Sequence, residues 1–394
     1  VKSVKDKFKQ TDIGLIPKDW DVKTVSQFGD VKRGASSQFI KYVNRGIRLI
    51  RINDFLGENP AIVEQTDEIM KFAVDEHDVL FAGTGASAGE SFIPKKEWIG
   101  CPHSYNAPRI RVKKEYSKEY LLCSLQSDYV RKQMKSLLVG AAQPFLDINA
   151  ISNFKIATPS TIIEQSRIAQ TLFDIDKFID TLEQLILKKK NIMQGVMQQL
   201  LTGKIRLYGF IEKWKLEKLC DISKITMGQS PESKFYNNSN DGLPLIQGNA
   251  DIKERETIIR FFTSKITKTG YKGDIIMSVR APVGEIARAT FDCCLGRGVC
   301  AISYKNNYLY YYLIFIEKCW GSISTGSTFD SINSKEVSDL EIFIPNSEKE
   351  QIAISKILLE MDLEIKKLKQ NRDKHILLKD GMSQKLLSGE IRLK

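Results

Sequence analysis

Apolar side chains recur every three or four residues along two long stretches of this chain. This spacing is typical of an α-helix that buries one apolar stripe against a second helix, as in a coiled coil. The predicted seam residues are Ile168, Leu172, Ile175, Ile179 and Leu182 in the first stretch and Ile354, Leu358, Met361, Ile365 and Leu368 in the second. Each predicted helix has about 40 residues and a length of about 60 Å. Because one helix cannot bury such a stripe alone, we expect the two to pack together.

The two stretches are copies of each other. Matched residues are separated by 186 positions throughout, from Glu164 and Glu350 to the endings QQLLTGKIRL (198–207) and QKLLSGEIRL (384–393). A packed helix keeps such a constant offset, whereas loops tolerate insertions. Gly203 and Gly389, near the endings, are predicted C-terminal caps. Both seams become polar at one place, Lys189 in the first copy and His375 in the second, which fits a local stutter.

Charged residues indicate how the two helices are oriented. The first helix begins with acidic residues such as Glu164 and Asp176 and becomes basic at 188–190. This order suits the helix dipole. It places acidic residues beside basic ones across the pair only if the helices run antiparallel. The second decapeptide should then return beside the first domain.

A weaker repeat precedes each helix. Trp20 and Trp214 each lie fourteen residues before a glycine, Gly34 and Gly228, and short β-branched runs such as DVLF and DIIM alternate with Gly, Ser and Asn turns. Such runs are typical of strands. We therefore predict an α+β chain with a pseudo-twofold internal repeat, in which two mixed α/β domains are joined by two long antiparallel helices. The predicted boundaries are 1–160 (head one), 161–207 (central helix), 208–346 (head two) and 347–394 (C-terminal helix).

Composition narrows the class of protein. The chain has 394 residues, so more than one domain is expected. A net charge of +11, from 59 basic and 48 acidic residues, favours a polyanionic partner but is also compatible with a merely basic soluble protein. No apolar run is long enough to cross a membrane, and the charged residues 1–12 predict a cytoplasmic protein. The seven cysteines include no C-x-x-C pair, and we expect reduced thiols and no metal site.

The duplicated pattern resembles the specificity subunit of Type I restriction-modification enzymes. The resemblance covers nearly the whole chain and is carried by the domain–helix duplication, by EQSRIA (164–169) and EQIA (350–353), and by the LLTGKIRL and LLSGEIRL endings. It implies two target-recognition domains that read the halves of a split site in double-stranded DNA, with the helices as spacer and docking surface. It also implies two modification (methyltransferase) subunits and restriction subunits as partners. S-adenosylmethionine, ATP and Mg are then expected on those partners, and no cofactor on this chain.

The sequence carries no catalytic motif of its own. It lacks the Asp/Asn-Pro-Pro-aromatic tetrapeptide of amino-methyltransferases, LTGKIR lacks features of a phosphate-binding loop, and GTGASAG spaces its glycines wrongly for a dinucleotide loop. We therefore expect a non-catalytic subunit of an endonuclease and adenine-specific methyltransferase complex. Two alternatives stay open: a coiled-coil adaptor with two protein-binding heads, and a fused methyltransferase or nuclease.

Candidate DNA contacts are polar or basic loop residues at equivalent places in both heads. Arginine suits guanine, and Asn or Gln suits adenine. The candidates in head one are Arg33, Ser36, Ser37, Gln38, Arg51, Asn53, Thr84 and Gln143. The candidates in head two are Gln229, Ser230, Gln247, Asn249, Arg280, Arg297, Ser327 and Thr328. Taken singly, each of them is more typical of a solvated loop side chain than of a base contact, so the prediction concerns the set.

Overall fold

The computed structural model describes residues 7–56, 60–138, 145–317 and 331–394. The chain forms two compact units. Unit 1 consists of Val1–Leu182 and Asn371–Lys394, and unit 2 consists of Glu183–Gln370. Each unit therefore contains one head together with one end of both long helices, and the two units are described one at a time.

Two long helices confirm the predicted pair. Helix α6 (Ile162–Leu200) has 39 residues and helix α11 (Glu348–Leu387) has 40. Gly203 and Gly389 have φ angles of 68° and 74°. In α6 the N–H of Ile205 bonds to the carbonyl of Gln199 at 3.1 Å, and the equivalent bond closes α11. The N–H groups of Gly203 and Gly389 also bond to the carbonyls of Leu200 and Leu386, at 3.4 and 3.2 Å. Both glycines therefore cap their helices, as predicted.

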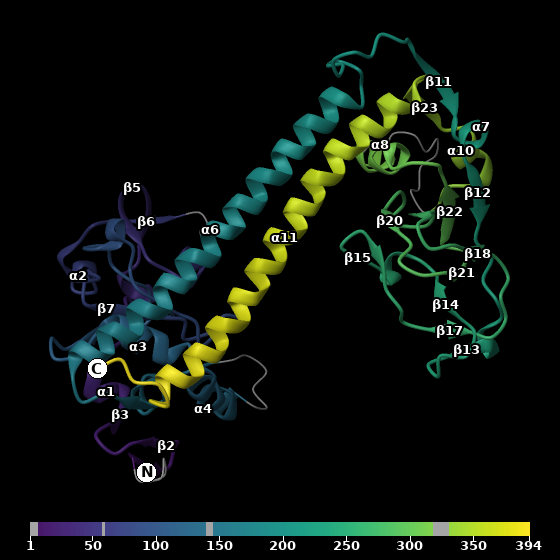
Figure 1. Ribbon diagram of the computed structural model, residues 1–394. Helices are drawn as coiled ribbons and strands as arrows, with labels where there is room; N and C mark the ends of the chain where they lie inside the picture. The colour runs from purple at the N-terminus through teal and green to yellow at the C-terminus, as the bar shows by residue number, and fades with distance from the viewer. Residues whose placement is uncertain (1–6, 57–59, 139–144, 318–330) are drawn as a thin grey trace. The chain divides into compact units, whose positions relative to one another are not determined.

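The helices run antiparallel, as their charges predicted. In unit 1 the first half of α6 packs beside the end of α11, where Lys379 forms an ion pair with Asp176. In unit 2 the end of α6 packs beside the first half of α11, where Lys189 Nζ lies 2.7 Å from Glu364 Oε1. Figure 1 shows the opposite directions of the two ribbons, in teal and yellow. Only an antiparallel pair brings these residues together.

The predicted seam faces inward over most of its length. Buried seam residues are Ile168, Leu172, Ile179, Leu182, Ile354, Leu358 and Ile365. Ile175, Met361 and Leu368 are half-buried. The first residues of each seam also enter the core of the head that precedes them, so the helices are part of the heads and not a separate layer.

Unit 1 contains short strands and helices around one large hydrophobic cluster and two smaller ones. Its strands are β1 (Phe8–Thr11), β2 (Gly14–Pro17), β3 (Asp21–Thr24), β4 (Gly29–Lys32), β5 (Tyr42–Leu49), β6 (Ala61–Val63), β7 (Asp78–Phe81), β8 (Ser91–Phe92), β9 (Arg109–Val112) and β10 (Lys155–Thr158). Its helices besides α6 and α11 are α1 (Val25–Phe28), α2 (Asp67–Met70), α3 (Lys118–Leu125), α4 (Asp128–Leu138) and α5 (Ile148–Ser152), with 3-10 turns η2 (Ser37–Phe39), η3 (Ile52–Leu56) and η4 (Lys96–Trp98). The main sheet has the order β4-β9-β7-β8, and β1–β2, β3–β10 and β5–β6 form separate antiparallel pairs.

Unit 2 contains two larger sheets. Its strands are β11 (Trp214–Lys218), β12 (Lys224–Met227), β13 (Tyr236–Asn237), β14 (Leu243–Ile246), β15 (Ile252–Lys253), β16 (Glu256–Thr257), β17 (Phe262–Thr263), β18 (Thr269–Gly270), β19 (Ile275–Ser278), β20 (Ile286–Arg288), β21 (Cys293–Leu295), β22 (Val299–Ser303) and β23 (Glu341–Pro345). Its described helices besides α6 and α11 are α7 (Leu219–Ile222), α8 (Tyr308–Ile316) and α10 (Ser334–Ser338), with 3-10 turns η5 (Ser233–Phe235) and η6 (Asn249–Asp251). The sheet orders are β12-β22-β19-β20-β16-β15 and β13-β17-β14-β21-β18, and β11 pairs with β23. With unit 1, these elements confirm the predicted α+β class.

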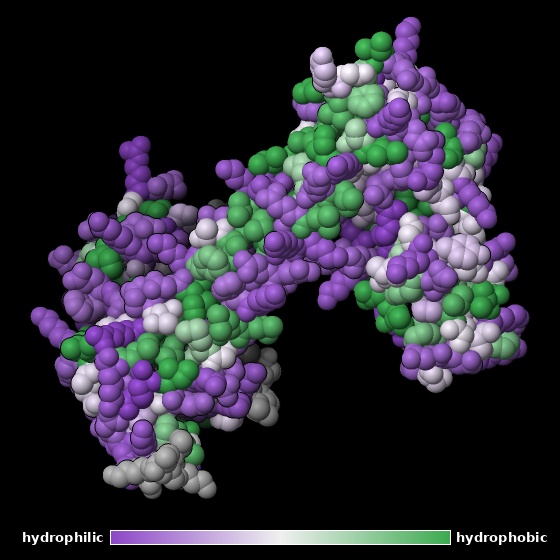
Figure 2. Space-filling view, in the orientation of Figure 1, coloured by the Kyte–Doolittle hydropathy of each residue, from purple (hydrophilic) through white to green (hydrophobic). Residues whose placement is uncertain are grey.

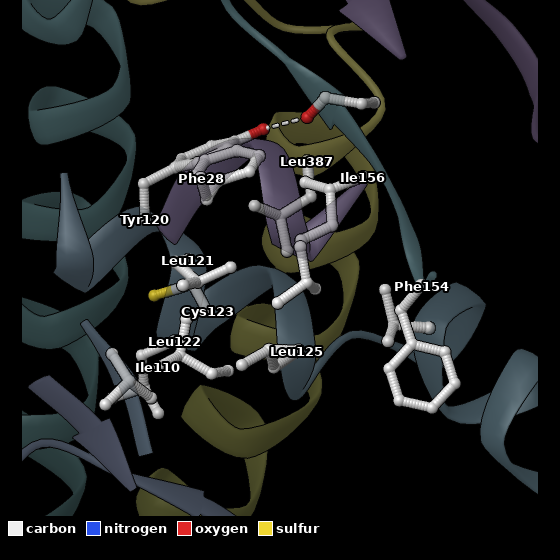
Figure 3. Packing of buried hydrophobic residues seen from close by; sticks show 14 of the residues in the cluster. Phe28, Ile110, Tyr120, Leu121, Leu122, Cys123, Leu125, Phe154, Ile156 and Leu387 are labelled. Atoms are coloured by element: carbon white, nitrogen blue, oxygen red, sulfur yellow. Dashed lines mark hydrogen bonds between the residues drawn. The ribbon is translucent and has the colours of Figure 1, made fainter. Parts of the chain in front are cut away.

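The internal repeat is visible in the cores. In unit 1 the buried Tyr120 donates a hydrogen bond to the carbonyl of Ala157, at 2.6 Å (Figure 3). In unit 2 the buried Tyr308 donates to the carbonyl of Phe343, at 3.0 Å. Each bond ties the first helix after the main sheet to the strand that leads into a long helix. The two heads thus repeat a three-dimensional contact as well as a sequence pattern.

A buried glutamate joins the start of one repeat to the end of the other. In unit 1, Glu164 accepts hydrogen bonds from Arg392 at 2.5 and 2.8 Å and from the indole N–H of Trp20 at 3.3 Å. The side chain of Glu164 is only 3 % exposed. Three charge-assisted or polar bonds therefore satisfy a carboxylate that would be costly to bury alone.

Unit 2 contains the equivalent contact among a glutamate, an arginine and a tryptophan, and we call each of these two contacts a junction. Glu350 accepts bonds from Arg206 at 2.6 and 2.8 Å and from Trp214 at 3.3 Å. The glutamine after each glutamate also has a repeated role, since Gln165 and Gln351 donate to the carbonyls of Pro159 and Pro345. The EQ and IRL motifs are therefore two sides of one contact, which sequence reasoning did not connect.

Candidate nucleic-acid interface

Five of the candidate residues in head one line a single hollow of about 790 Å³. Ser36 and Ser37 come from the start of η2, Arg51 and Asn53 follow β5, and Thr84 follows β7. These three segments are far apart in sequence, but strand pairing brings them together. Strand β7, which precedes Thr84, pairs with β9, and the loop before β9 forms isolated bridges with the other two segments, from Ser104 to Ala35 and from His103 to Ile50. The hollow therefore has a wall of hydroxyl, amide and guanidinium groups, which are able to contact base edges and phosphates.

Arg33 lies at the edge of this hollow and is held by aromatic rings. Its guanidinium lies 4.3 Å from the ring centre of Tyr105, a lining residue, and 4.9 Å from that of Phe145. Its Nη1 atom is buried and has no hydrogen-bond partner within the described part of the chain. Two aromatic contacts restrict the rotation of the side chain, so the guanidinium is oriented before any ligand binds.

The other two candidates in head one are placed differently. Gln38 is exposed on η2 and is not a lining residue of the hollow. Gln143 lies outside the described residues. Sequence reasoning also missed the contributions of Tyr42, Tyr105 and Asn106 to the wall. Tyr105 and Asn106 stand in the turn-forming stretch HSYNAP, and that composition was the available signal.

The described candidates of head two gather around the turn between β21 and β22. The hydroxyl of Ser230 accepts the N–H of Arg297 at 3.0 Å, and the backbone of Gln229 bonds to Leu295 at 2.8 Å. Gly298 approaches the carbonyl of Gln247 so closely that a Cβ on Gly298 would lie 2.1 Å from that oxygen. This turn therefore brings the loops after β12 and β14 together.

One further loop, after β19, reaches the same turn. Val279, beside the exposed Arg280, bonds through its N–H to the carbonyl of Gly298 at 2.9 Å. The amide of Asn249 donates to the carboxylate of Glu285. Because a carboxylate only accepts, this contact fixes which way the Asn249 amide faces. Ser327 and Thr328 lie outside the described residues.

Three thiols of unit 2 belong to its core. Cys293, Cys294 and Cys300 are buried, and burial raises the pKa of Cys300 to about 12. Such thiols are poor nucleophiles and poor metal ligands. Among residues 7–56, 60–138, 145–317 and 331–394, no group of three or more His, Cys, Asp or Glu side chains has the arrangement of a metal site. Within the same ranges, no helix is long and apolar enough to span a membrane.

Comparison with known proteins identifies the family. The model of the Type I restriction modification DNA specificity domain matches residues 17–189 and again residues 211–376. A protein named as the MjaX specificity subunit of a type I restriction enzyme, from Methanocaldococcus jannaschii, is 28% identical over 419 residues, which cover 99% of this chain and 97% of that protein. The MjaVIII specificity subunit of the same organism is 26% identical over 212 residues, 51% of this chain and 49% of its own length.

Solved structures share the fold. A chain from a study of assembly and conformational transition of the type I R-M system has a TM-score of 0.61 and 23% identity, and covers 95% of this chain and 99% of its own. The S subunit of a Type-I restriction-modification system from M. genitalium has a TM-score of 0.63 and 17% identity, with 97% and 98% coverage. Because the two family matches together span most of the sequence and fall on its two repeats, the chain belongs to the family defined by the Type I restriction modification DNA specificity domain.

Proposed function

We propose that this chain is the sequence-specific DNA-recognition subunit of a Type I restriction-modification complex. The observation that carries the proposal is the gathering of polar and basic loop residues at one place in each of two repeated heads. In head one these residues line one hollow, and in head two they surround one turn. Two readers in one chain suit a target with two separate halves.

Charge supports DNA as the partner. The chain carries a net charge of +11, so phosphate contacts by Lys and Arg would supply affinity that does not depend on sequence. The loop side chains would then supply the sequence preference, with Arg33 and Arg51 suited to guanine and Gln247 and Asn249 suited to adenine. These loop side chains lie within residues 1–160 and 208–346, which we propose as the two target-recognition domains.

The long helices would serve as spacer and as docking surface. Apolar side chains remain exposed on them, as Figure 2 shows in green along the helices. Ile192 on α6 is 45% exposed, and Leu378, its counterpart 186 residues later on α11, is 50% exposed. Exposed apolar residues at repeated positions favour two equivalent partners. These would be two modification subunits, followed by restriction subunits, which would bring S-adenosylmethionine, ATP and Mg.

In this proposal the chain itself catalyses nothing and directs the chemistry of its partners. A methyltransferase or nuclease fused into the chain would instead show turnover with the purified chain alone, given DNA and S-adenosylmethionine or Mg. A coiled-coil adaptor would not select DNA at all. The deciding experiment is a selection from duplexes with random sequence, using the full chain copurified with its modification subunits.

The expected result is a retained motif with two conserved blocks around an unread gap. Arg33→Ala should remove base preference from one block only, and Gln247→Ala from the other block only. Retention of DNA without any motif, or loss of both blocks in each variant, would contradict the proposal. The exposed Lys213→Ala serves as control and should leave both blocks intact.

A further inference from the structure

A buried carboxylate lies in the loop after β5 that carries Arg51 and Asn53, which we call the reader loop of head one. Asp54 is 1% exposed, and its Oδ2 accepts the backbone N–H of Arg51 at 2.9 Å. Its Oδ1 accepts two bonds from Arg48, at 2.5 Å from Nη2 and 3.2 Å from Nε. The guanidinium of Arg48 in turn lies 5.5 Å from the ring centre of Trp98. Asp54 therefore fixes the point at which the backbone of Arg51 leaves strand β5.

Head two contains the same kind of contact in the loop after β14 that carries Gln247 and Asn249, which is its reader loop. Asp251 is 3% exposed, and its Oδ2 accepts the backbone N–H groups of Gln247 at 2.7 Å and Gly248 at 3.2 Å. Its Oδ1 lies 3.6 Å from Nη1 of Arg260. A buried carboxylate thus again holds the peptide of the first reader residue after a strand. Asp251 pairs with Arg260, whereas Asp54 pairs with Arg48 and also lies 3.7 Å from Nε of Arg51.

The two carboxylates are not a simple copy of one position. Asp54 lies three residues after Arg51, whereas Asp251 lies four residues after Gln247. The amino acids between them also differ, as the stretches RIND and QGNAD show. The contact is thus the same in both heads although the local sequences have diverged. This recurrence favours a requirement on the placement of the reader over a shared ancestral detail.

We propose that Asp54 and Asp251 are the positioning residues of the two reader loops. Readout of a base edge needs a donor placed within a few tenths of an ångström, which a free loop does not provide. A charge-assisted bond to the reader's own N–H supplies that placement, and burial excludes water as a competing partner. The inference rests on the proposed DNA-reading function and concerns the accuracy of reading rather than the affinity for DNA.

The test is the duplex selection described above, applied to Asp54→Asn in the full chain with its modification subunits. The substitution keeps the size of the side chain but turns an N–H donor toward Arg48. The base preference of head one's block should fall roughly tenfold at one or two positions, because one good base contact is worth that much discrimination. The block read by head two should keep its preference and so reports that the molecule is folded. Asp251→Asn should give the mirror result.

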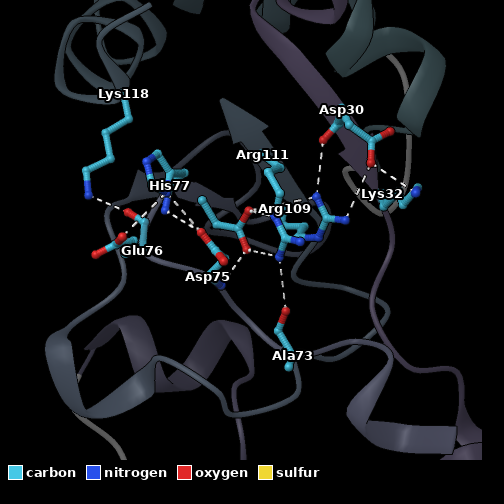
Figure 4. A network of polar contacts seen from close by, with 10 residues as sticks. Asp30, Lys32, Ala73, Asp75, Glu76, His77, Arg109, Arg111 and Lys118 are labelled. Atoms are coloured by element: carbon cyan, nitrogen blue, oxygen red, sulfur yellow. Dashed lines mark hydrogen bonds and ion pairs between the residues drawn. The ribbon is translucent and has the colours of Figure 1, made fainter. Parts of the chain in front are cut away.

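A matched control comes from a buried carboxylate of head one outside the reader loop. Asp78 on β7 is fully buried and accepts bonds from Arg111 at 2.9 and 3.0 Å, within the network around Arg111 and Arg109 shown in Figure 4. Asp78→Asn should lower the thermal midpoint without changing either block.

A rescue variant, Arg48→Met with Asp54→Asn, removes the clash and leaves an amide oxygen for the N–H of Arg51. It should restore much of the lost preference.

The outcomes separate this inference from the proposed function. If Arg51→Ala weakens the first block while Asp54→Asn leaves it unchanged, the loop reads DNA but Asp54 does not position it, and the inference is overturned. If neither variant changes the first block, the loop does not read bases, and the reader assignment falls with the inference. If Asp54→Asn and Asp78→Asn weaken both blocks alike, Asp54 has only a structural role. Should Asp54→Asn fail to fold, Asp251→Asn decides by the same criteria.

Discussion

Lys189 and Glu364 face each other across α6 and α11, with 2.7 Å between Nζ and Oε1. The positions related to them by the repeat are His375 and Phe178, and these two also face each other, with 4.7 Å between ring centres. The polar interruption of both seams therefore coincides with a contact between the two helices. It is one cross-helix contact made twice, with a different pair of side chains in each unit.

This contact predicts a charge-reversal cycle. Lys189→Glu should lower the free energy of unfolding by up to about 1 kcal/mol, since the pair is partly exposed and is screened by solvent. Lys189→Glu combined with Glu364→Lys should recover most of that loss. Chemical denaturation at low and at moderate salt measures both effects. Lys188→Glu, on the exposed side of α6, is the control and should cost clearly less.

The junction at Glu164 predicts a larger loss. Among the described residues, Arg392→Ala would leave the indole of Trp20 as the one remaining partner of a carboxylate that is 3% exposed. Removal of one partner from a buried pair typically costs about 3 kcal/mol, and here somewhat less because Arg392 is itself 22% exposed. Hydrogen exchange should show the loosening in unit 1. Equal loosening of unit 2 would contradict the assignment, and Arg206→Ala should loosen unit 2 instead.

Protonation of His103 predicts how stability depends on pH. Burial lowers the pKa of His103 to about 4 from an ordinary value near 6.5, while its Nδ1 lies 2.7 Å from the carbonyl of Ala107. The unfolded chain therefore binds a proton below pH 6.5 that the folded chain does not bind until about pH 4. Stability should fall as pH drops through this window, by about 1 to 2 kcal/mol at pH 5.

The measurement is denaturation of the parent and of His103→Gln between pH 5 and 7.5. The variant should lose this part of the pH dependence, whereas His77→Gln, at a partly exposed position, should retain it. An unchanged slope in His103→Gln would mean that other groups control acid stability. The effect matters for the reader surface because His103 immediately precedes the lining residues Ser104 and Tyr105.

The spacer role predicts a coordinated change in the DNA target. Inserting seven residues into both helices, after Leu182 and after Gln370, keeps the seam in register and lengthens each helix by about 10.5 Å. The unread gap of the selected motif should grow by about three base pairs, while both blocks keep their bases. The same insertion in α6 alone should instead destabilise the chain, because the two seams no longer match. An unchanged gap with full binding in the double insertion would show that the helices do not set the distance.

Regular features were predictable from the sequence, and contacts between distant residues were not. The seam, the constant offset and the cap glycines are local patterns, and each of them follows from helix geometry. The ion pair between Glu164 and Arg392 joins residues 228 positions apart, so no local pattern reveals it. The carboxylate of Asp54 was likewise hidden, because an aspartate after a strand is more often an exposed turn residue than a buried anchor. Equivalent loop positions did indicate the candidate site, although aromatic residues such as Tyr105 were missed.

The junctions also have a consequence for synthesis. Unit 1 includes residues at both ends of the chain, so Trp20 and Glu164 leave the ribosome long before Arg392 exists. At usual translation rates that interval is on the order of 10 to 50 s. During this time the first head must persist with its glutamate lacking the arginine, whereas Arg206 is already made when Glu350 emerges. The head translated first is therefore the last to be completed, and it is the one that a chaperone or protease would meet in unfinished form.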